Sequence, residues 1–151
     1  MSKTQDNPDR LFIQEFITNQ WTDRPVTGSP LAVLLGMKLL SASRGEIRAS
    51  FDVGSNFTQG GGAVQGGIVT SLLDFGMAFA GLSVLDTGKT ATTIALSVNF
   101  LRPAYSGIHE VHAQLDKVGR NLLYASAKLY CQNGSLIATA NSPLAIISIP
   151  S

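Results

Sequence analysis

Residues 66–85 read GGIVTSLLDFGMAFAGLSVL, and this stretch decides the fold. It is apolar on every side except at Asp74, which is typical of a helix surrounded by protein. Residues 68–85 approach the length of a membrane span, but Asp74 and internal glycines interrupt them, and no basic residue flanks their N-terminal side. The stretch therefore predicts a core helix that ends at the turn Asp86-Thr87-Gly88.

Alternating apolar and polar residues on both sides of this helix predict β-strands. The expected strands span residues 37–43, 46–53, 90–102, 107–118, 121–132 and 136–149. In the strand 90–102, the alternation places Thr92, Ile94 and Phe100 on one face. Short turns such as Asn133-Gly134 join the later strands, so we expect an antiparallel sheet. One central helix with such a sheet is an α+β arrangement.

The N-terminal part of the chain has a different pattern. Residues 1–8 are polar and we expect them to be disordered, whereas 11–21 predict a short amphipathic helix. Ser29 followed by Pro30 is typical of a second short helix start. We therefore divide the chain into an N-terminal tail with short helices, residues 1–33, and a single domain, residues 34–151.

Composition excludes several classes of protein. The 151 residues carry a formal net charge of +1, which argues against nucleic-acid binding driven by phosphate attraction. Charged residues make up only 14%, which suggests that partners cover much of the surface. Residues 1–10 lack the apolar run of a secretory signal, so we interpret the protein as cytoplasmic, with no membrane span.

The cysteine and the two histidines give little sign of metal chemistry. Cys131 is the single cysteine, so neither a disulfide framework nor a cysteine zinc site is possible, and its alternating surroundings predict a buried thiol. His109 and His112 are three residues apart on an expected strand and therefore face opposite sides. We expect both to be surface histidines, and we expect no metal site.

The glycines before the helix are the first candidate site. They match neither a P-loop nor G-x-G-x-x-G. Gly66 and Gly67 at a helix start leave backbone N–H groups accessible, and the helix dipole favours negative charge there. Such a site can act as an oxyanion hole. The alternative is that the glycines only permit a tight turn against the sheet.

Asp74 is the second candidate, because a carboxylate among apolar residues is costly unless it is partnered or functional. The alternative is a structural Asp74 that pairs with an arginine or a backbone donor. Gly66 and Asp74 are about 12 Å apart along one helix, from its rise per residue. Reacting atoms must lie about 3–3.5 Å apart. If both residues act on one carbonyl, they must come from two antiparallel helices of an isologous dimer.

Three segments resemble the hotdog-fold acyl-CoA thioesterases, in particular the phenylacetyl-CoA and 4-hydroxybenzoyl-CoA types. They are Gln59 to Asp74, the run TTIALSVNFLRPA at 92–104, and Lys117-Val-Gly-Arg120. The resemblance extends over residues 34–147. It implies a curved antiparallel β-sheet wrapped around one long central helix. It also implies hydrolysis of an aryl or medium-chain acyl-CoA to free acid and coenzyme A without a cofactor, in a homodimer that pairs into a homotetramer.

The resemblance also implies roles for individual residues. The Gly66 amide polarises the thioester carbonyl, and Asp74 acts as nucleophile or general base. Gln59 lies near the attacking water, and Thr93 assists that water, although one inserted residue leaves Thr92 as an alternative. Arg102, Lys117 and Arg120 would contact the phosphates of coenzyme A. Gln65 and Gly67 would contact the substrate from the loop at the start of the helix. Gln65 stands where the family has a histidine.

Two other functions remain open from the sequence. A hotdog dehydratase needs a histidine with an acidic residue, and the absence of histidine on or beside the helix argues against it. A non-catalytic acyl-CoA binder would retain Asp74 as a structural residue. The acyl group is not specified by the sequence, but an apolar pocket is predicted from Phe57, Phe75, Met77 and Phe79.

Overall fold

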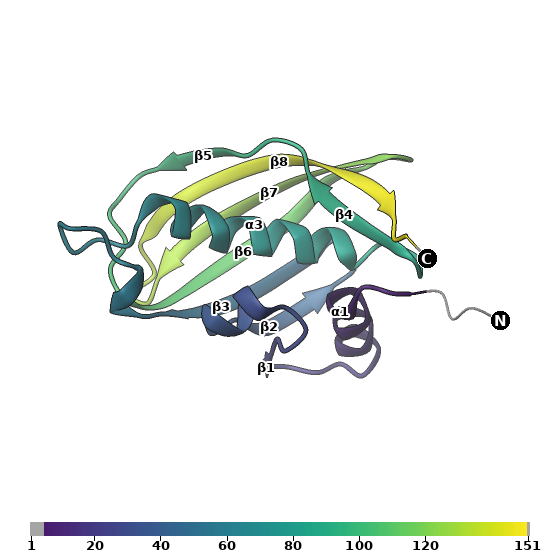
Figure 1. The fold of residues 1–151 in the computed structure, drawn as a ribbon, viewed down its shortest axis with the longest axis horizontal. Coiled ribbons are helices and arrows are strands. Elements are labelled where there is room, and N and C mark those ends of the chain that lie inside the picture. The colour runs from purple at the N-terminus through teal and green to yellow at the C-terminus, as the bar shows by residue number, and fades with distance from the viewer. Residues whose placement is uncertain (1–4, 151) are drawn as a thin grey trace.

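The computed structural model of the chain describes residues 5–150. Its antiparallel sheet of eight strands curves around one long helix, α3, Gly66–Leu82 (Figure 1). The sheet has the order β1-β2-β3-β6-β7-β8-β4, and β5 also pairs with β8. The strands are β1 Arg24–Pro25, β2 Lys38–Ser43, β3 Glu46–Val53, β4 Lys89–Thr93, β5 Ser97–Phe100, β6 Gly107–Val118, β7 Leu122–Cys131 and β8 Leu136–Ser148. This arrangement confirms the predicted α+β hotdog fold.

Helix α3 lies directly on the sheet because small residues face it. A Cβ on Gly76 would lie 2.4 Å from Val111 Cγ1, so only glycine allows this approach to β6. Leu72, Leu73 and Met77 are fully buried in the same interface. Within residues 5–150, no helix is both long enough and apolar enough to cross a membrane. With Leu72, Leu73 and Met77 buried against the sheet, the 66–85 stretch forms a core helix, which ends three residues earlier than predicted.

The prediction that protein surrounds α3 on all sides is wrong for the isolated chain. The side of the helix that carries Thr70, Ser71 and Asp74 is only half-buried, and Gly67 is exposed. These positions follow helical spacing and form one continuous stripe. The sheet therefore covers α3 on one side and leaves the other side open.

The single strand predicted over residues 90–102 is also wrong, because the structure divides it into β4 and β5. Thr93 pairs with Leu144, and Ser97 pairs with Asn141. Between these two pairs, the segment that joins β4 to β5 has three residues, whereas β8 has two. This extra residue is a β-bulge. It lies opposite Pro143, which accepts a hydrogen bond from Ile94 N–H at 3.0 Å but has no N–H to return.

The bulge changes which residues face the helix. In β4 the inward side chains are odd-numbered, including Ala91 and Thr93, whereas Leu96 and Val98 pack against the core after the bulge. Thr92 is exposed, and Ile94 has 55% of its surface exposed. The predicted common face also included Leu96 and Val98, and these two residues do pack against the core. Thr92 and Ile94 do not share that face, and Phe100 has 55% of its surface exposed.

The N-terminal helices pack against the central fold. Helix α1, Pro8–Thr18, begins earlier than predicted because the Asn7 side chain accepts a hydrogen bond from Asp9 N–H and caps it. Of the eight residues expected to be disordered, 1–4 lie outside the described residues, and Pro8 is helical. Helix α2, Pro30–Leu34, follows Ser29 as predicted.

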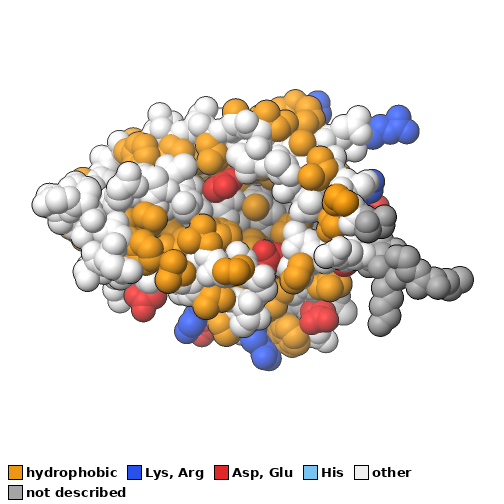
Figure 2. Space-filling view, viewed as in Figure 1, with side chains coloured by type: hydrophobic (Ala, Val, Ile, Leu, Met, Phe, Trp, Pro, Cys, Tyr) orange, Lys and Arg blue, Asp and Glu red, His pale blue; other side chains and the backbone are white. Residues whose placement is uncertain are grey.

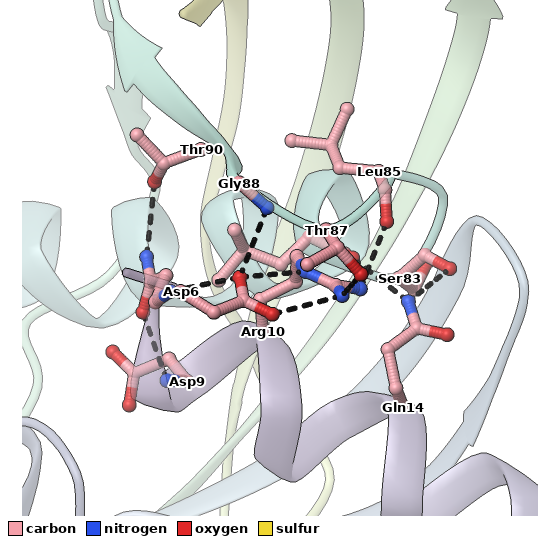
Figure 3. A network of polar contacts seen from close by, with 11 residues as sticks. Asp6, Asp9, Arg10, Gln14, Ser83, Leu85, Thr87, Gly88 and Thr90 are labelled. Atoms are coloured by element: carbon pink, nitrogen blue, oxygen red, sulfur yellow. Dashed lines mark hydrogen bonds and ion pairs between the residues drawn. The ribbon is translucent and has the colours of Figure 1, made fainter. Parts of the chain in front are cut away.

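A buried ion pair fixes α1 to the end of α3. Arg10 has only 6% of its surface exposed and forms two hydrogen bonds of 3.0 Å with the Asp6 carboxylate (Figure 3). Its guanidinium also donates to Leu85 O at 3.1 Å and to Thr87 Oγ1 at 2.8 Å. Both acceptors follow α3, so the pair binds the turn that leads into β4.

Two neighbouring side chains extend this anchor. Asn7 Nδ2 donates to Thr90 Oγ1 on β4 at 2.9 Å. Gln14 Nε2 donates to the carbonyls of Leu82 and Ser83 at the C-terminal end of α3, at 3.2 and 3.0 Å (Figure 3). The N-terminal helix thus provides partners for backbone groups that a helix end leaves unsatisfied.

Removing the negative charge of this pair should destabilise the fold. Burial alone would raise the pKa of Asp6, but hydrogen bonds from Arg10 and from the Asn7 and Gly88 amides hold that pKa below its ordinary value. Because the pKa is lower in the folded state, the pair stabilises the protein above pH about 4 and loses this effect as the pH falls through the lowered value. We expect Asp6→Asn to reduce the free energy of unfolding by about 3 kcal/mol at pH 7.

Urea titrations at pH 7 and at decreasing pH would measure this effect. The difference between the native protein and Asp6→Asn should shrink in acid. Glu15→Gln on the exposed side of α1 is the matched control, and it should change stability little. A loss of stability in Asp6→Asn that stays constant down to acidic pH would contradict an electrostatic origin.

Candidate active site

Asp74 lies on the half-buried stripe of α3, where β4 reaches it. Thr93 Oγ1 donates a hydrogen bond of 2.7 Å to Asp74 Oδ1. Thr92 faces the opposite side of β4 and is exposed. The structure therefore brings together two of the predicted site residues, Asp74 and Thr93, and shows that Thr92 is not the equivalent partner. A hydrogen bond to a carboxylate orients it and leaves its second oxygen available.

The first turn of α3 has one amide without a partner. Gln65 caps the helix, and its Oε1 accepts a hydrogen bond of 2.6 Å from Gly67 N–H. Ile68 N–H donates to the Gln65 carbonyl at 2.9 Å. Within residues 5–150, Gly66 N–H has no hydrogen-bond acceptor. This single free amide at a helix N-terminus can donate to a negatively charged oxygen.

The packing of this chain does not require glycine at position 66. A Cβ there would lie 3.6 Å from Phe100 Cζ, which is ordinary van der Waals contact. The bare Cα instead leaves the free amide open to a ligand. Gly67 differs, because a Cβ there would lie 2.7 Å from the Gln65 oxygen that caps the helix.

Gln65 and Gln59 are both engaged in local turns. The Gln65 cap shows how glutamine can anchor the loop at a position where the resembling family has histidine. Gln59 follows the short 3-10 turn Ser55–Phe57, and its Oε1 accepts a hydrogen bond from Gly61 N–H in its own exposed loop. Gln59 is therefore hydrogen-bonded within its own loop, and among the described residues it forms no hydrogen bond with Asp74.

The three predicted cations lie at opposite ends of the sheet. Arg102 donates to Leu136 O at 3.0 Å and shares a cavity wall with Gly107, where β6 begins. Lys117 is close to the other end of β6, with Nζ 6.0 Å from the centre of the Tyr124 ring. Twelve residues of strand extend over about 36 Å. In one chain, Arg102 therefore cannot bind the same phosphate as Lys117 or Arg120, which follows β6.

Apolar side chains gather on the face that exposes α3, and acidic side chains are few there (Figure 2). Phe57 and Phe75 are half-buried, and Phe100 beside Gly66 has 55% of its surface exposed. Met77 and Phe79 are fully buried in the core, so the prediction that they line a substrate pocket is wrong.

Two predictions about exposure are also wrong. His109 is 3% exposed because it lies on the same face of β6 as Val111 and Ala113, which point into the core. Its odd position in that alternation was the signal that could have revealed this. Cys131 is only partly buried, at the last position of β7, where the hairpin turn begins. Across residues 5–150, no group of three or more metal-ligating side chains is present.

Comparisons with known proteins agree with this fold. Residues 61–138 match the family described as the thioesterase superfamily. A protein of Saccharolobus solfataricus, provisionally named an esterase, is 29% identical over 106 residues, 70% of each chain. A thioesterase family protein from Silicibacter pomeroyi is 27% identical, with a TM-score of 0.75 over 80% of this chain and 91% of that one.

A third comparison shows the fold alone. A Streptococcus mutans protein solved with bound acetyl-CoA is 18% identical, with a TM-score of 0.68 over 75% of this chain and 90% of that one.

The matched family segment contains the cap at Gln65, the free amide of Gly66 and the Asp74–Thr93 pair. The chain belongs to the thioesterase superfamily. This membership and the names of the relatives support a hydrolase of the thioester class.

The contact between Thr93 and Asp74 predicts that the two adjacent threonines differ in importance. Thr93→Val keeps the side-chain shape and removes the donor to Asp74, so we expect kcat/KM for thioester hydrolysis to fall about tenfold, equivalent to about 1.4 kcal/mol. Thr92→Val is the matched control and should stay within about twofold, because its side chain points to solvent. Equal effects of the two substitutions would contradict the observed register of β4.

Proposed function

We propose that the protein hydrolyses an acyl-CoA thioester, with aryl or medium-chain acyl groups as the substrate class, to a free acid and coenzyme A. The observation that carries the proposal is the carboxylate of Asp74, held by Thr93 on the open side of α3. A free amide at Gly66 on the same helix supplies the second requirement, a donor for the carbonyl oxygen.

Each residue has a defined step in this reaction. The Gly66 N–H donates to the thioester carbonyl oxygen and stabilises the negative charge that develops there. Asp74 accepts a proton from water as that water attacks. Alternatively, Asp74 attacks the carbonyl carbon itself, and water then hydrolyses the resulting anhydride between the acyl group and Asp74. Thr93 keeps the carboxylate in position through its hydrogen bond. Coenzyme A leaves as a thiolate, and the acyl group leaves as the acid.

The active site is shared between two subunits in this proposal. Gly66 and Asp74 are the first and ninth residues of one helix, so they lie about 12 Å apart along its axis. A single carbonyl cannot reach both. Two antiparallel copies of α3, related by a two-fold axis, bring Gly66 of one chain to Asp74 of the other and also cover the half-buried stripe.

The edge of the sheet supports this dimer. Within the described residues β5 pairs only with β8, so its other edge has free backbone groups. Phe100 and Leu101 at this edge have 55% and 53% of their surfaces exposed. An unpaired apolar edge favours pairing with another chain. We propose a homodimer joined along this edge, with two dimers forming a homotetramer.

Binding of coenzyme A would use cations that lie far from Asp74 and from one another. Lys117 and Arg120 are exposed cations at one end of the sheet and can contact phosphates. Arg102 lies at the opposite end. It would contribute to the same site only from the second subunit. The Streptococcus mutans protein shows that a chain of this fold can bind acetyl-CoA. Gln59 would orient water only after turning away from Gly61.

Removing the ionisable group of Asp74 tests the chemistry. We expect Asp74→Asn to lower kcat by at least about a hundredfold, the usual scale for loss of a general base. Loss of thioester absorbance with a panel of aryl and medium-chain acyl-CoAs would measure this. The control is Asp52→Asn at an exposed position of β3, which should leave kcat unchanged. Circular dichroism should show that both variants are folded. Near-normal turnover in Asp74→Asn would refute the assignment.

The same panel separates the rival functions. A native protein that binds acyl-CoA but hydrolyses none of the panel would be a non-catalytic binder with a structural Asp74. Hydration or dehydration of an acyl chain in place of thioester cleavage would identify a dehydratase.

Mixing two inactive variants tests the shared site. One variant carries Asp74→Asn, and the other carries Gly66→Val, whose bulk should block approach to the free amide. In a mixed dimer one site contains both substitutions and the other contains neither. Refolding the variants together should therefore restore up to about half of the activity per mixed dimer. Verified mixed dimers without activity would show that each chain builds its own site.

A further inference from the structure

A cavity of about 480 Å³ lies at the end of the sheet where β6 begins, and no residue of α3 lines it. Its wall is formed by the segment 102–109, by the turn between β7 and β8, and by Ile137. Polar groups come from Arg102, Tyr105, His109, Cys131, Asn133 and Ser135. Of the predicted thioesterase residues, Arg102 alone lines this wall, so the cavity shares one residue with the proposed acyl-CoA site.

His109 makes the cavity polar. It is 97% buried, and its Nδ1–H donates to the Gly107 carbonyl at 3.1 Å. Burial lowers the pKa of His109, although the hydrogen bond to the Gly107 carbonyl opposes this, and the lowered pKa favours the neutral ring. Its Nε2 then carries a lone pair, for which residues 5–150 provide no donor. Because His109 lines the cavity, this nitrogen can accept a hydrogen bond from a polar ligand there.

Cys131 lies directly opposite His109 in the register between β7 and β6, on the same wall. Its thiol donates to Asn133 Oδ1 at 2.7 Å, inside the hairpin turn. Burial tends to raise the pKa of Cys131, but amides of Asn133 and Ser135 and the Ser135 hydroxyl bring it below the ordinary value. A lowered pKa increases the fraction of thiolate, which is the nucleophilic form of cysteine, and ionisation breaks the hydrogen bond to Asn133 Oδ1.

Arg102 supplies positive charge to the same wall. One guanidinium N–H donates to Leu136 O at 3.0 Å, which fixes the group at the cavity and leaves its other donors free. Among the residues that line the cavity, Arg102 is the permanently charged cation, since the lowered pKa of His109 favours its neutral form. A ligand with a carboxylate or phosphate is therefore favoured over a neutral or cationic one.

We propose that Cys131 is a modification site for small anionic disulfides, which bind in this cavity against Arg102 and exchange with the thiol. The disulfide brings an anionic group for Arg102 and a sulfur for Cys131. A hydroxyl or amide N–H on the same molecule donates to His109 Nε2. The product is a mixed disulfide that occupies the cavity.

The exchange needs no reagent beyond the disulfide itself. The Cys131 thiol first loses its proton to water. Its sulfur then attacks one sulfur of the disulfide, and a new S–S bond forms as the old S–S bond breaks. The other half of the disulfide leaves as a thiolate with the electron pair of the broken bond. The cysteine is oxidised, and the leaving half is reduced.

Two chromogenic disulfides of different charge test the proposal on the intact protein at pH 7. The first probe is the dianion 5,5′-dithiobis(2-nitrobenzoate), and the second is the neutral 4,4′-dithiodipyridine. The measured quantity is the rate constant of the dianion divided by that of the neutral probe, and this ratio should be higher in the native protein than in Arg102→Gln. We expect the ratio of the two rate constants to fall at least about fivefold in Arg102→Gln. Lys38→Gln, at an exposed cation on β2, is the control and should leave the ratio within about twofold.

Intact mass identifies the site of modification. One adduct should form on the native protein and none on Cys131→Ser. An unchanged ratio of rate constants in Arg102→Gln would overturn the proposal. A native thiol that reacts with neither probe until the protein is unfolded in urea would overturn it as well.

Discussion

The close packing of α3 on the sheet is the constraint on which the rest of the molecule depends. Gly76 has no Cβ, so the helix can lie against Val111, and apolar side chains such as Leu72 and Met77 fill the contact. The interface fixes the rotation of the helix about its own axis. The opposite stripe, with Asp74 in its middle, must then point away from the sheet.

A rigid helix also fixes the distance between the two proposed catalytic groups. Gly66 has the free amide and Asp74 has the carboxylate, and eight residues of helix separate them. No side-chain movement shortens that distance. The open stripe of α3 and the unpaired edge of β5 are therefore best explained together, because one two-fold partner would cover both and complete the site.

The two ends of the fold are stabilised by different means. At the C-terminal end of α3, the Asp6–Arg10 pair and Gln14 bind carbonyl groups that the helix cannot satisfy. At the end where β6 begins, strand and turn residues line a polar cavity around His109. The first end is closed by the N-terminal helix, and the second is open to ligands.

The sequence by itself determined the core helix, the strand pattern, and the candidates Gly66 and Asp74, because hydrophobic periodicity and helix rise are local properties. Tertiary structure alone decided that Thr93, and not Thr92, meets Asp74. The missing N–H of Pro143, fifty residues later in the chain, permits the bulge that shifts the face of the strand. Pairing across strands is non-local, so no pattern within one segment contains it.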